Sequence, residues 1–295
     1  MKPHSALAGV QPQIAQISTD RQSTRSTESV ARLRTPLRCS QFLARVLECR
    51  QLAPDIISCW LEAGAIARQV QPGQFVQVRV GPGFVPFLRR PFSIAERRET
   101  KLRVVFRAIG QGTRRLAAAQ VGDKWDIIGP LGKPTLAVKG RSVVIIGGGI
   151  GIAPLLFLAQ ERASTNELHV LLGARSRAEL LLRNEFRKLR ARVVLATEDG
   201  SVGIRGLVTD LFAREIHLQG TKTPENSVVF ACGPRPMLRR VKELTTGLEA
   251  YAFWEERLGC GTGICYCCAV KRVGSECYLR FCRDGPVLKL SEIVV

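Results

Sequence analysis

The sequence predicts a multidomain β plus α/β protein, in which an antiparallel β-barrel precedes a parallel α/β domain and a small C-terminal module. Short apolar runs separated by Pro, Gly and charged turns fill residues 39–138, which is typical of a small barrel. After Gly140, apolar runs alternate with helical segments, and this alternation indicates βαβ units. The last stretch is rich in Cys and Gly. The 295 residues suffice for two domains and a small third module.

Changes in composition set the expected boundaries. Residues 1–38 are rich in Ser, Thr, Gln and Arg without periodicity, so we predict a disordered basic tail, with an organelle transit peptide as the alternative. We expect the barrel over 39–138 and the α/β domain over 139–248. The segment 249–295 is too short to build its own core, so we expect a metal centre to stabilise it.

The individual elements follow from the apolar runs. Barrel strands are expected at 41–49, 56–62, 75–80, 92–95, 102–108 and 124–128. Strands of the parallel sheet are expected at 143–147, 168–173, 193–197 and 228–231. Helices are expected at 154–162, 178–190, 208–215 and 236–247.

The charge balance is strongly basic, with 44 Lys and Arg against 25 Asp and Glu, a net charge of +19. The excess is spread along the chain and is not interleaved with aromatics as single-strand binding requires, so we do not expect nucleic acid as a partner. No apolar run approaches the roughly 18–20 residues of a membrane span. The tail also lacks the apolar core of a signal peptide, so we expect a cytoplasmic protein without a membrane span.

The most specific motif is a group of cysteines near the C-terminus. Cys260, Cys265 and Cys268 follow the spacing C-x4-C-x2-C, and Cys282 follows after thirteen residues. The first three match the plant-type spacing of a [2Fe–2S] cluster, in which a distant Cys completes the ligand set. Gly261 and Gly263 would let the loop curl and point N–H groups at sulfur.

Two alternatives to this ligand set remain open. Thiolates also bind zinc, although structural zinc usually takes paired short knuckles. Cys267 competes with Cys268 for the third position and Cys277 with Cys282 for the fourth, but the spacing favours Cys268 and Cys282. In a cytoplasmic chain, clustered cysteines indicate metal binding more than a disulfide framework.

A glycine turn suggests a Rossmann-like nucleotide site. The apolar run from Val143 leads into Gly147-Gly148-Gly149-Ile150-Gly151, and we expect a helix with Pro154 at its first position. Such a turn presents helix amides to a pyrophosphate. The usual acidic residue for the adenosine ribose is absent, and Arg175 and Arg177 stand near that place. NAD and NADP therefore both remain possible.

Two further motifs are consistent with a redox cofactor. Cys232-Gly233-Pro234 follows an expected strand, at the sheet edge where ligands bind. Arg90-Pro91-Phe92-Ser93 is followed by Arg107 and by Gly110-Gln111-Gly112-Thr113. An Arg can neutralise a pyrophosphate, an aromatic ring can pack on a flavin, and Gly112 and Thr113 offer donors to phosphate. No His has an identifiable catalytic partner, so we expect no catalytic acid or base.

The order of these motifs resembles the ferredoxin–NADP reductase superfamily. The cysteine segment, with Phe281-Cys282-Arg283-Asp284-Gly285-Pro286 after it, is similar to the family of electron-transfer subunits of NAD-dependent dihydroorotate dehydrogenase B. The resemblance covers about residues 41–295. The basic tail, Phe92, Cys267 and Cys277 depart from the family pattern. The cysteine motif joined to Asp-Gly-Pro is the specific part, whereas Arg-Pro-Phe-Ser is common to the superfamily.

This resemblance implies FAD in the barrel, a nicotinamide nucleotide on the α/β domain and a [2Fe–2S] cluster at the C-terminus. The FAD residues it implies are Arg90, Pro91, Phe92, Ser93, Val105, Phe106, Arg107, Gly112 and Thr113. Those implied for the nucleotide are Gly147, Gly148, Gly149, Gly151 and Cys232. Those implied for the cluster are Cys260, Cys265, Cys268 and Cys282.

The resemblance also implies a function in pyrimidine biosynthesis. A partner subunit containing FMN would oxidise dihydroorotate within a heterotetramer, and electrons would pass through the cluster and FAD to NAD⁺. FAD belongs between the other two carriers because NAD exchanges two electrons and the cluster one. Alternatives with the same cofactors are a sulfhydrogenase subunit or an NAD(P)H–ferredoxin oxidoreductase. A more distant alternative is a zinc-stabilised, basic nucleic-acid-binding module.

Overall fold

The computed structural model describes residues 39–218 and 226–295. The expected tail, 1–38, lies outside the described residues and stays a prediction. Within the described part of the chain, no helix is both long and apolar enough to cross a membrane.

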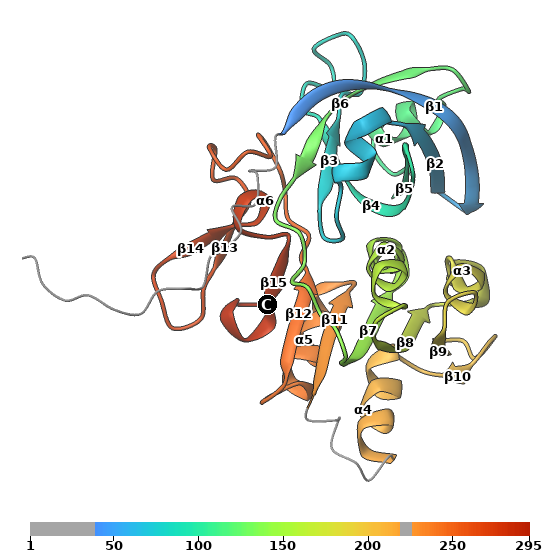
Figure 1. Cartoon of the computed structure of the whole chain (residues 1–295), viewed down its shortest axis with the longest axis vertical. Coiled ribbons are helices and arrows are strands. Elements are labelled where there is room, and N and C mark those ends of the chain that lie inside the picture. Colours follow the sequence, from blue (N-terminus) through green and yellow to red (C-terminus); the bar gives the residue numbers. More distant parts are fainter. Residues whose placement is uncertain (1–38, 219–225) are drawn as a thin grey trace, which may run out of the picture. The chain divides into compact units, whose positions relative to one another are not determined.

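The first part of the chain forms the expected antiparallel barrel, closed in the order β1-β2-β5-β4-β3-β6 (Figure 1). Apolar side chains at alternate positions fill its interior, including Phe92, Phe106 and Trp125. Its strands are β1 (Ser40–Ala53), β2 (Ile56–Glu62), β3 (Phe75–Val78), β4 (Arg90–Arg98), β5 (Lys101–Arg107) and β6 (Lys124–Leu131). One feature was not expected: Cys49 and Cys59, which face each other on β1 and β2, form a disulfide.

The α/β domain is built on a seven-stranded sheet in the order β10-β9-β8-β7-β11-β12-β15. Its first six strands in this order run parallel, and β15 joins β12 in the antiparallel direction. The strands are β7 (Ser142–Gly148), β8 (Glu167–Ala174), β9 (Ala191–Thr197), β10 (Ile204–Arg205), β11 (Ser227–Cys232), β12 (Glu249–Phe253) and β15 (Val287–Lys289). The sheet thus continues past the boundary expected at residue 248, because β12 pairs with β11.

The helices α2 (Ile152–Arg162), α4 (Val208–Leu218) and α5 (Arg235–Leu244) lie where helices were expected. Pro154 stands third rather than first in α2, because the turn Gly149–Gly151 runs directly into the helix. The helix expected at 178–190 is reduced to α3 (Arg183–Arg187). Leu182 adopts a left-handed conformation with φ 54° before α3, and Leu180 and Leu181 are buried in the core. Tertiary packing therefore overrides the helical pattern there.

Helix α2 packs between the sheet and the barrel strand β4. Two ion pairs join the same two domains: Arg97 to Glu161 at 2.8 Å and Arg103 to Glu185 at 3.3 Å. Arg103 is 2% exposed and also bonds the buried Glu96 at 3.2 Å. The barrel and the sheet thus share a buried charged contact in addition to apolar packing.

The cysteine-rich segment lies between β12 and β15. It contains a hairpin of β13 (Ala269–Lys271) and β14 (Tyr278–Arg280), followed by the single turn α6 (Phe281–Asp284). The ring of Phe281 stacks on Phe75 of the barrel with 5.8 Å between centroids. Because β12 and β15 on either side of it both belong to the sheet, the segment is anchored to the α/β domain at both ends.

Candidate redox site

The loop 259–266 curls around the sulfur of Cys260. Gly261 and Gly263 have φ of 74° and 86°, as expected for a tight loop. The backbone N–H groups of Thr262, Ile264 and Cys265 donate to Cys260 Sγ at 3.4, 3.4 and 3.5 Å. The predicted orientation of N–H groups toward sulfur is therefore present at this cysteine.

The four predicted cysteines form two pairs. The backbone N–H of Cys260 donates to Cys265 Sγ at 3.4 Å, and the sulfurs of Cys268 and Cys282 lie 3.3 Å apart. Across residues 39–218 and 226–295, no three or more His, Cys, Asp or Glu side chains surround one point closely enough to hold a single ion. A [2Fe–2S] cluster needs two sulfur ligands on each of two irons, whereas zinc needs four ligands around one centre. The donor set therefore fits a two-iron cluster.

The two pairs differ in their electrostatics. Burial alone would raise the pKa of Cys260, but hydrogen bonds from Thr262, Cys265 and Ile264 outweigh it and lower the pKa to about 5. Burial, and next the hydrogen bond with Cys268, raises the pKa of Cys282 to about 12. A bound metal ion deprotonates a coordinating thiol outright, so both pairs can serve as thiolate ligands.

Cys267 and Cys277, the two alternative ligands, differ from Cys268 and Cys282 in their exposure to solvent. Cys268 and Cys282 are buried, 1% and 2% exposed, whereas Cys267 and Cys277 are exposed. The backbone of Cys277 bonds Ser275 and Arg272 within the hairpin turn. Cys268 and Cys282 thus lie together in the structure, and the choice of ligands over Cys267 and Cys277 stays a prediction.

A residue that the sequence did not reveal connects the cysteine loop to the barrel. Gln77 on β3 is 1% exposed, and its Nε2 donates to the carbonyl oxygen of Gly259 at 3.3 Å. A Cβ on Gly261 would lie 2.8 Å from the Gln77 side chain, so the loop can approach β3 closely only with glycine there. Gln77 lies on the outward face of β3, between Val76 and Val78, which point into the barrel, and the sequence alone does not show what covers that face.

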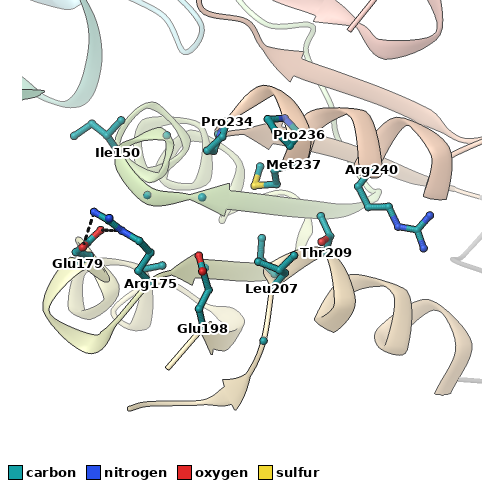
Figure 2. A pocket seen from close by; sticks show the side chains of 18 of the residues that line it. Ile150, Arg175, Glu179, Glu198, Leu207, Thr209, Pro234, Pro236, Met237 and Arg240 are labelled. Carbon is teal, nitrogen blue, oxygen red and sulfur yellow. Dashed lines mark hydrogen bonds and ion pairs between the residues drawn. The ribbon is translucent and has the colours of Figure 1, made fainter. Parts of the chain in front are cut away.

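A cavity of about 630 Å³ opens at the carboxyl edge of the sheet (Figure 2). Three of the predicted nucleotide residues, Gly148, Gly149 and Gly151, line it beside Gly233, and Arg107 reaches it from the barrel. The other lining residues come from the turn between β7 and α2, from the segments that follow β8, β9, β11 and β12, and from α4 and α5. Among them are Ile150, Arg175, Glu179, Glu198, Leu207, Thr209, Pro234, Pro236, Met237 and Arg240.

Two of the glycines make close contacts, Gly151 with backbone and Gly148 with the end of a flexible side chain. A Cβ on Gly151 would lie 2.5 Å from the carbonyl oxygen of Cys232, and one on Gly148 would lie 2.5 Å from Met237 Sδ. The glycine turn and the Cys-Gly-Pro motif are therefore in direct contact. Cys232 itself is 1% exposed, and burial raises its pKa well above the usual value.

Glu255 is a cavity residue that the sequence did not indicate. It follows β12 and lines the same cavity. The surrounding walls desolvate its carboxylate and raise its pKa, although the side chain is open to the cavity. Its position at the carboxyl end of a strand adjacent to β11 was the missed signal.

In the barrel, Arg90 and Gly112 are in contact. A Cβ on Gly112 would lie 2.8 Å from Arg90 Nε, so the guanidinium rests directly on the turn that begins α1 (Gln111–Ala117). The Thr113 hydroxyl bonds the backbone of Gly110 at 3.1 and 3.2 Å. It is therefore used within its own turn, and the backbone is left as the source of donors.

The other predicted flavin residues divide by strand alternation. Phe92 and Phe106 point into the barrel with their rings 4.8 Å apart, so their side chains are part of the barrel core. Ser93 is half-buried and Pro91 is exposed. Val105 packs in the core of the α/β domain, and Arg107 pairs with Asp55 at 3.1 Å where it reaches the cavity.

A closed antiparallel barrel, a parallel sheet with a glycine turn and a cysteine loop together define an oxidoreductase of the ferredoxin reductase-like class. Two family models match the chain: the iron–sulfur cluster binding domain of dihydroorotate dehydrogenase B over residues 255–294, and the oxidoreductase NAD-binding domain over 145–243. The chain belongs to the family of electron transfer subunits of dihydroorotate dehydrogenase B (NAD(+)).

The similarity extends over nearly the whole length of individual relatives. The subunit from Desulforamulus reducens is 39% identical over 86% of this chain and 98% of its own. The subunit from Geobacillus thermodenitrificans is 36% identical over 85% and 97%. Among solved structures, an NADH-dependent reduced ferredoxin–NADP oxidoreductase has a TM-score of 0.77 at 26% identity, covering 86% of this chain and 90% of its own. A Neisseria gonorrhoeae ferredoxin NADP⁺ reductase shares the fold, with a TM-score of 0.59 at 20% identity over 74% and 94%.

Proposed function

We propose that this chain passes electrons from a dihydroorotate-oxidising partner subunit to NAD⁺, through a [2Fe–2S] cluster held by Cys260, Cys265, Cys268 and Cys282 and through FAD held by the barrel. Its family membership supports this function. When bound, FAD exchanges one or two electrons, which lets it connect the single electron of a cluster with the hydride of NAD(H). The reaction belongs to pyrimidine biosynthesis.

The main support for the proposal is that the cysteine loop and the nucleotide cavity both include or contact residues of the barrel. The cysteine loop contacts β3 through Gln77, and the nucleotide cavity includes Arg107 of β5. A barrel that borders both sites is where an intermediate carrier between them belongs.

Each group of residues then has a distinct task. The Arg90 guanidinium, lying on Gly112, would neutralise the FAD pyrophosphate, and Ser93 would offer a hydroxyl to the flavin ring. The turn Gly148–Gly151 would hold the nucleotide pyrophosphate at the first turn of α2. The N–H groups around Cys260 stabilise negative charge on sulfur, which tunes the potential of a bound cluster.

The partner would dock at the cysteine loop. Ile264 and Tyr266, between the cluster cysteines, are 80% and 57% exposed. Exposed apolar side chains beside a redox centre suit an interface with another protein. We propose an FMN-containing catalytic subunit in a cytoplasmic heterotetramer as this partner.

The experiment is co-purification from the native cell, followed by an assay of NAD⁺ reduction with dihydroorotate. The proposal predicts that a dihydroorotate-oxidising subunit co-purifies and that NADH forms only when both subunits are present. Recovery of a hydrogenase or a ferredoxin instead, without dihydroorotate-dependent formation of NADH, would contradict the proposed partner. The cofactors would then serve a different electron-transfer reaction.

A further inference from the structure

One end of the nucleotide cavity is formed by three charged side chains, Arg175, Glu179 and Glu198 (Figure 2). Arg175 follows β8 and Glu198 follows β9. The hydrogen-bond ladder continues past both strands, because the N–H of Glu198 donates to the carbonyl oxygen of Ala174 at 3.1 Å. The N–H of Asp199 donates to the carbonyl oxygen of Arg175 at the same distance. The backbone thus fixes Glu198 beside Arg175.

The Arg175 guanidinium already forms an ion pair with the carboxylate of Glu179. Its Nε donates to Glu179 Oε2 at 3.1 Å, and its Nη2 lies 2.9 Å from Glu179 Oε1. This is the two-point geometry with which an Arg would otherwise bind a phosphate. Arg177, the other candidate from the sequence, does not line the cavity. Its backbone N–H donates to Ser201 Oγ at 2.7 Å.

Glu198 contributes a second negative charge. Its side chain is exposed to the cavity, and no donor in the described ranges, 39–218 and 226–295, bonds its carboxylate. Two carboxylates and one guanidinium leave this end of the cavity negative. The adenosine ribose of NAD offers hydroxyl donors that suit a carboxylate. A 2′-phosphate carries a charge of about −1.5 to −2, which the two carboxylates would repel.

We infer that Glu179 and Glu198 make the cavity selective for a nicotinamide dinucleotide with a free 2′-hydroxyl. Glu179 acts through Arg175, as a positioning residue that removes a phosphate receptor. Glu198 acts on the nucleotide itself, by accepting a hydrogen bond from the ribose and repelling a 2′-phosphate. The inference rests on the proposed use of this cavity for a nicotinamide nucleotide, and it names the residues that would give a preference for NAD over NADP despite Arg175 and Arg177.

The test compares nucleotides on the purified holoprotein. Calorimetry measures the affinities for 5′-AMP and for adenosine 2′,5′-bisphosphate, and ferricyanide reduction gives kcat/KM for NADH and NADPH. Glu179→Gln should raise the NADPH-to-NADH ratio of kcat/KM about tenfold by freeing Arg175. Adding Arg175→Ala to Glu179→Gln should cancel most of that gain. Glu198→Gln should raise the ratio by a similar factor and weaken 5′-AMP binding.

Glu215→Gln is the matched control. Glu215 pairs with Arg192 at 2.9 Å near the amino end of β9, away from the carboxyl edge that carries the cavity, and it does not line the cavity, so Glu215→Gln changes net charge equally and should leave the ratio unchanged. Equal use of NADH and NADPH by the wild type, or no change in Glu179→Gln and Glu198→Gln, would overturn the inference while leaving the proposed function intact. Failure of the wild type to oxidise either nucleotide would instead count against the proposed function.

Discussion

Gln77 of the barrel and Gly259 of the cysteine loop are joined by a hydrogen bond of 3.3 Å, although 182 residues separate them in the chain. The Gln77 side chain also fills the space that a Cβ on Gly261 would need. The cysteine loop is thus held by two domains: the sheet through β12 and β15, and the barrel through β3. The distance from the cluster site to the barrel depends on this contact.

Gln77→Leu tests that contact. Leu keeps the volume but cannot donate to Gly259, and it leaves the carbonyl oxygen without its partner, so we expect faster loss of the cluster and slower transfer between cluster and flavin. The cluster absorbance over time and rapid-mixing kinetics measure the two effects. Gln41→Leu is the control, because Gln41 bonds Asp126 on the exposed side of the barrel. Equal behaviour of the two variants would show that the Gln77 contact is incidental.

The ligand choice is tested by serine substitutions. Cys265→Ser and Cys268→Ser should each lose the cluster, since a hydroxyl is a poorer iron ligand than a thiolate. Both should retain FAD and NADH-dependent dye reduction. Cys267→Ser, beside Cys268 in the chain and exposed, should keep the cluster. If Cys267→Ser loses it while Cys268→Ser keeps it, the ligand register is wrong.

The glycine turn should not tolerate a Cβ at Gly151. In Gly151→Ala the new Cβ would meet the backbone carbonyl of Cys232 at 2.5 Å, and backbone cannot swing aside as a side chain can. We expect KM for NADH to rise at least about tenfold with FAD retained, because misplacement of this order is costly at a binding turn. Gly83→Ala, where a Cβ meets nothing within 4 Å, should be neutral. An unchanged KM in Gly151→Ala would contradict the assigned pyrophosphate site.

The buried charged contact between the domains should matter for stability. Arg103→Ala leaves the buried Glu96 with Arg98 as its one remaining partner among the described residues, so we expect a loss of about 3 kcal/mol in unfolding free energy. Arg192→Ala, which removes an exposed pair with Glu215, should cost less than about 1 kcal/mol. Denaturant unfolding of both variants measures the difference, and equal losses would contradict the structural role of Arg103.

The basic tail should be dispensable. A chain beginning at Cys39 starts just before β1, and the removed residues 1–38 show no apolar periodicity in the sequence. We expect it to keep both cofactors and most of the NADH-dependent dye reduction. Loss of FAD or of partner binding in the shortened chain would reveal a function for the tail.

The sequence was most informative where a feature depends on short-range patterns of residues. Apolar alternation predicted the barrel and most sheet strands, and the cysteine spacing and the glycine turn indicated the cysteine loop and the nucleotide cavity, because each pattern depends on residues close in the chain. Gln77, Glu198 and Glu255 were missed because their roles arise from contacts between distant segments. Phe92 was assigned to the flavin from its motif, but strand alternation turns it into the barrel. The helix expected at 178–190 failed because burial of Leu180–Leu182 outweighed helical periodicity.

In the proposed function, one chain holds both a flavin and a two-iron cluster and connects them to a nicotinamide nucleotide. Anaerobic titration of the purified protein, followed by visible absorbance and electron paramagnetic resonance, tests it most directly. We expect uptake of about three electrons per chain, two by FAD and one by the cluster, with NADH bleaching the flavin and producing the resonance of a reduced [2Fe–2S] cluster. Zinc without acid-labile sulfide, or flavin reduction with no cluster resonance, would contradict it.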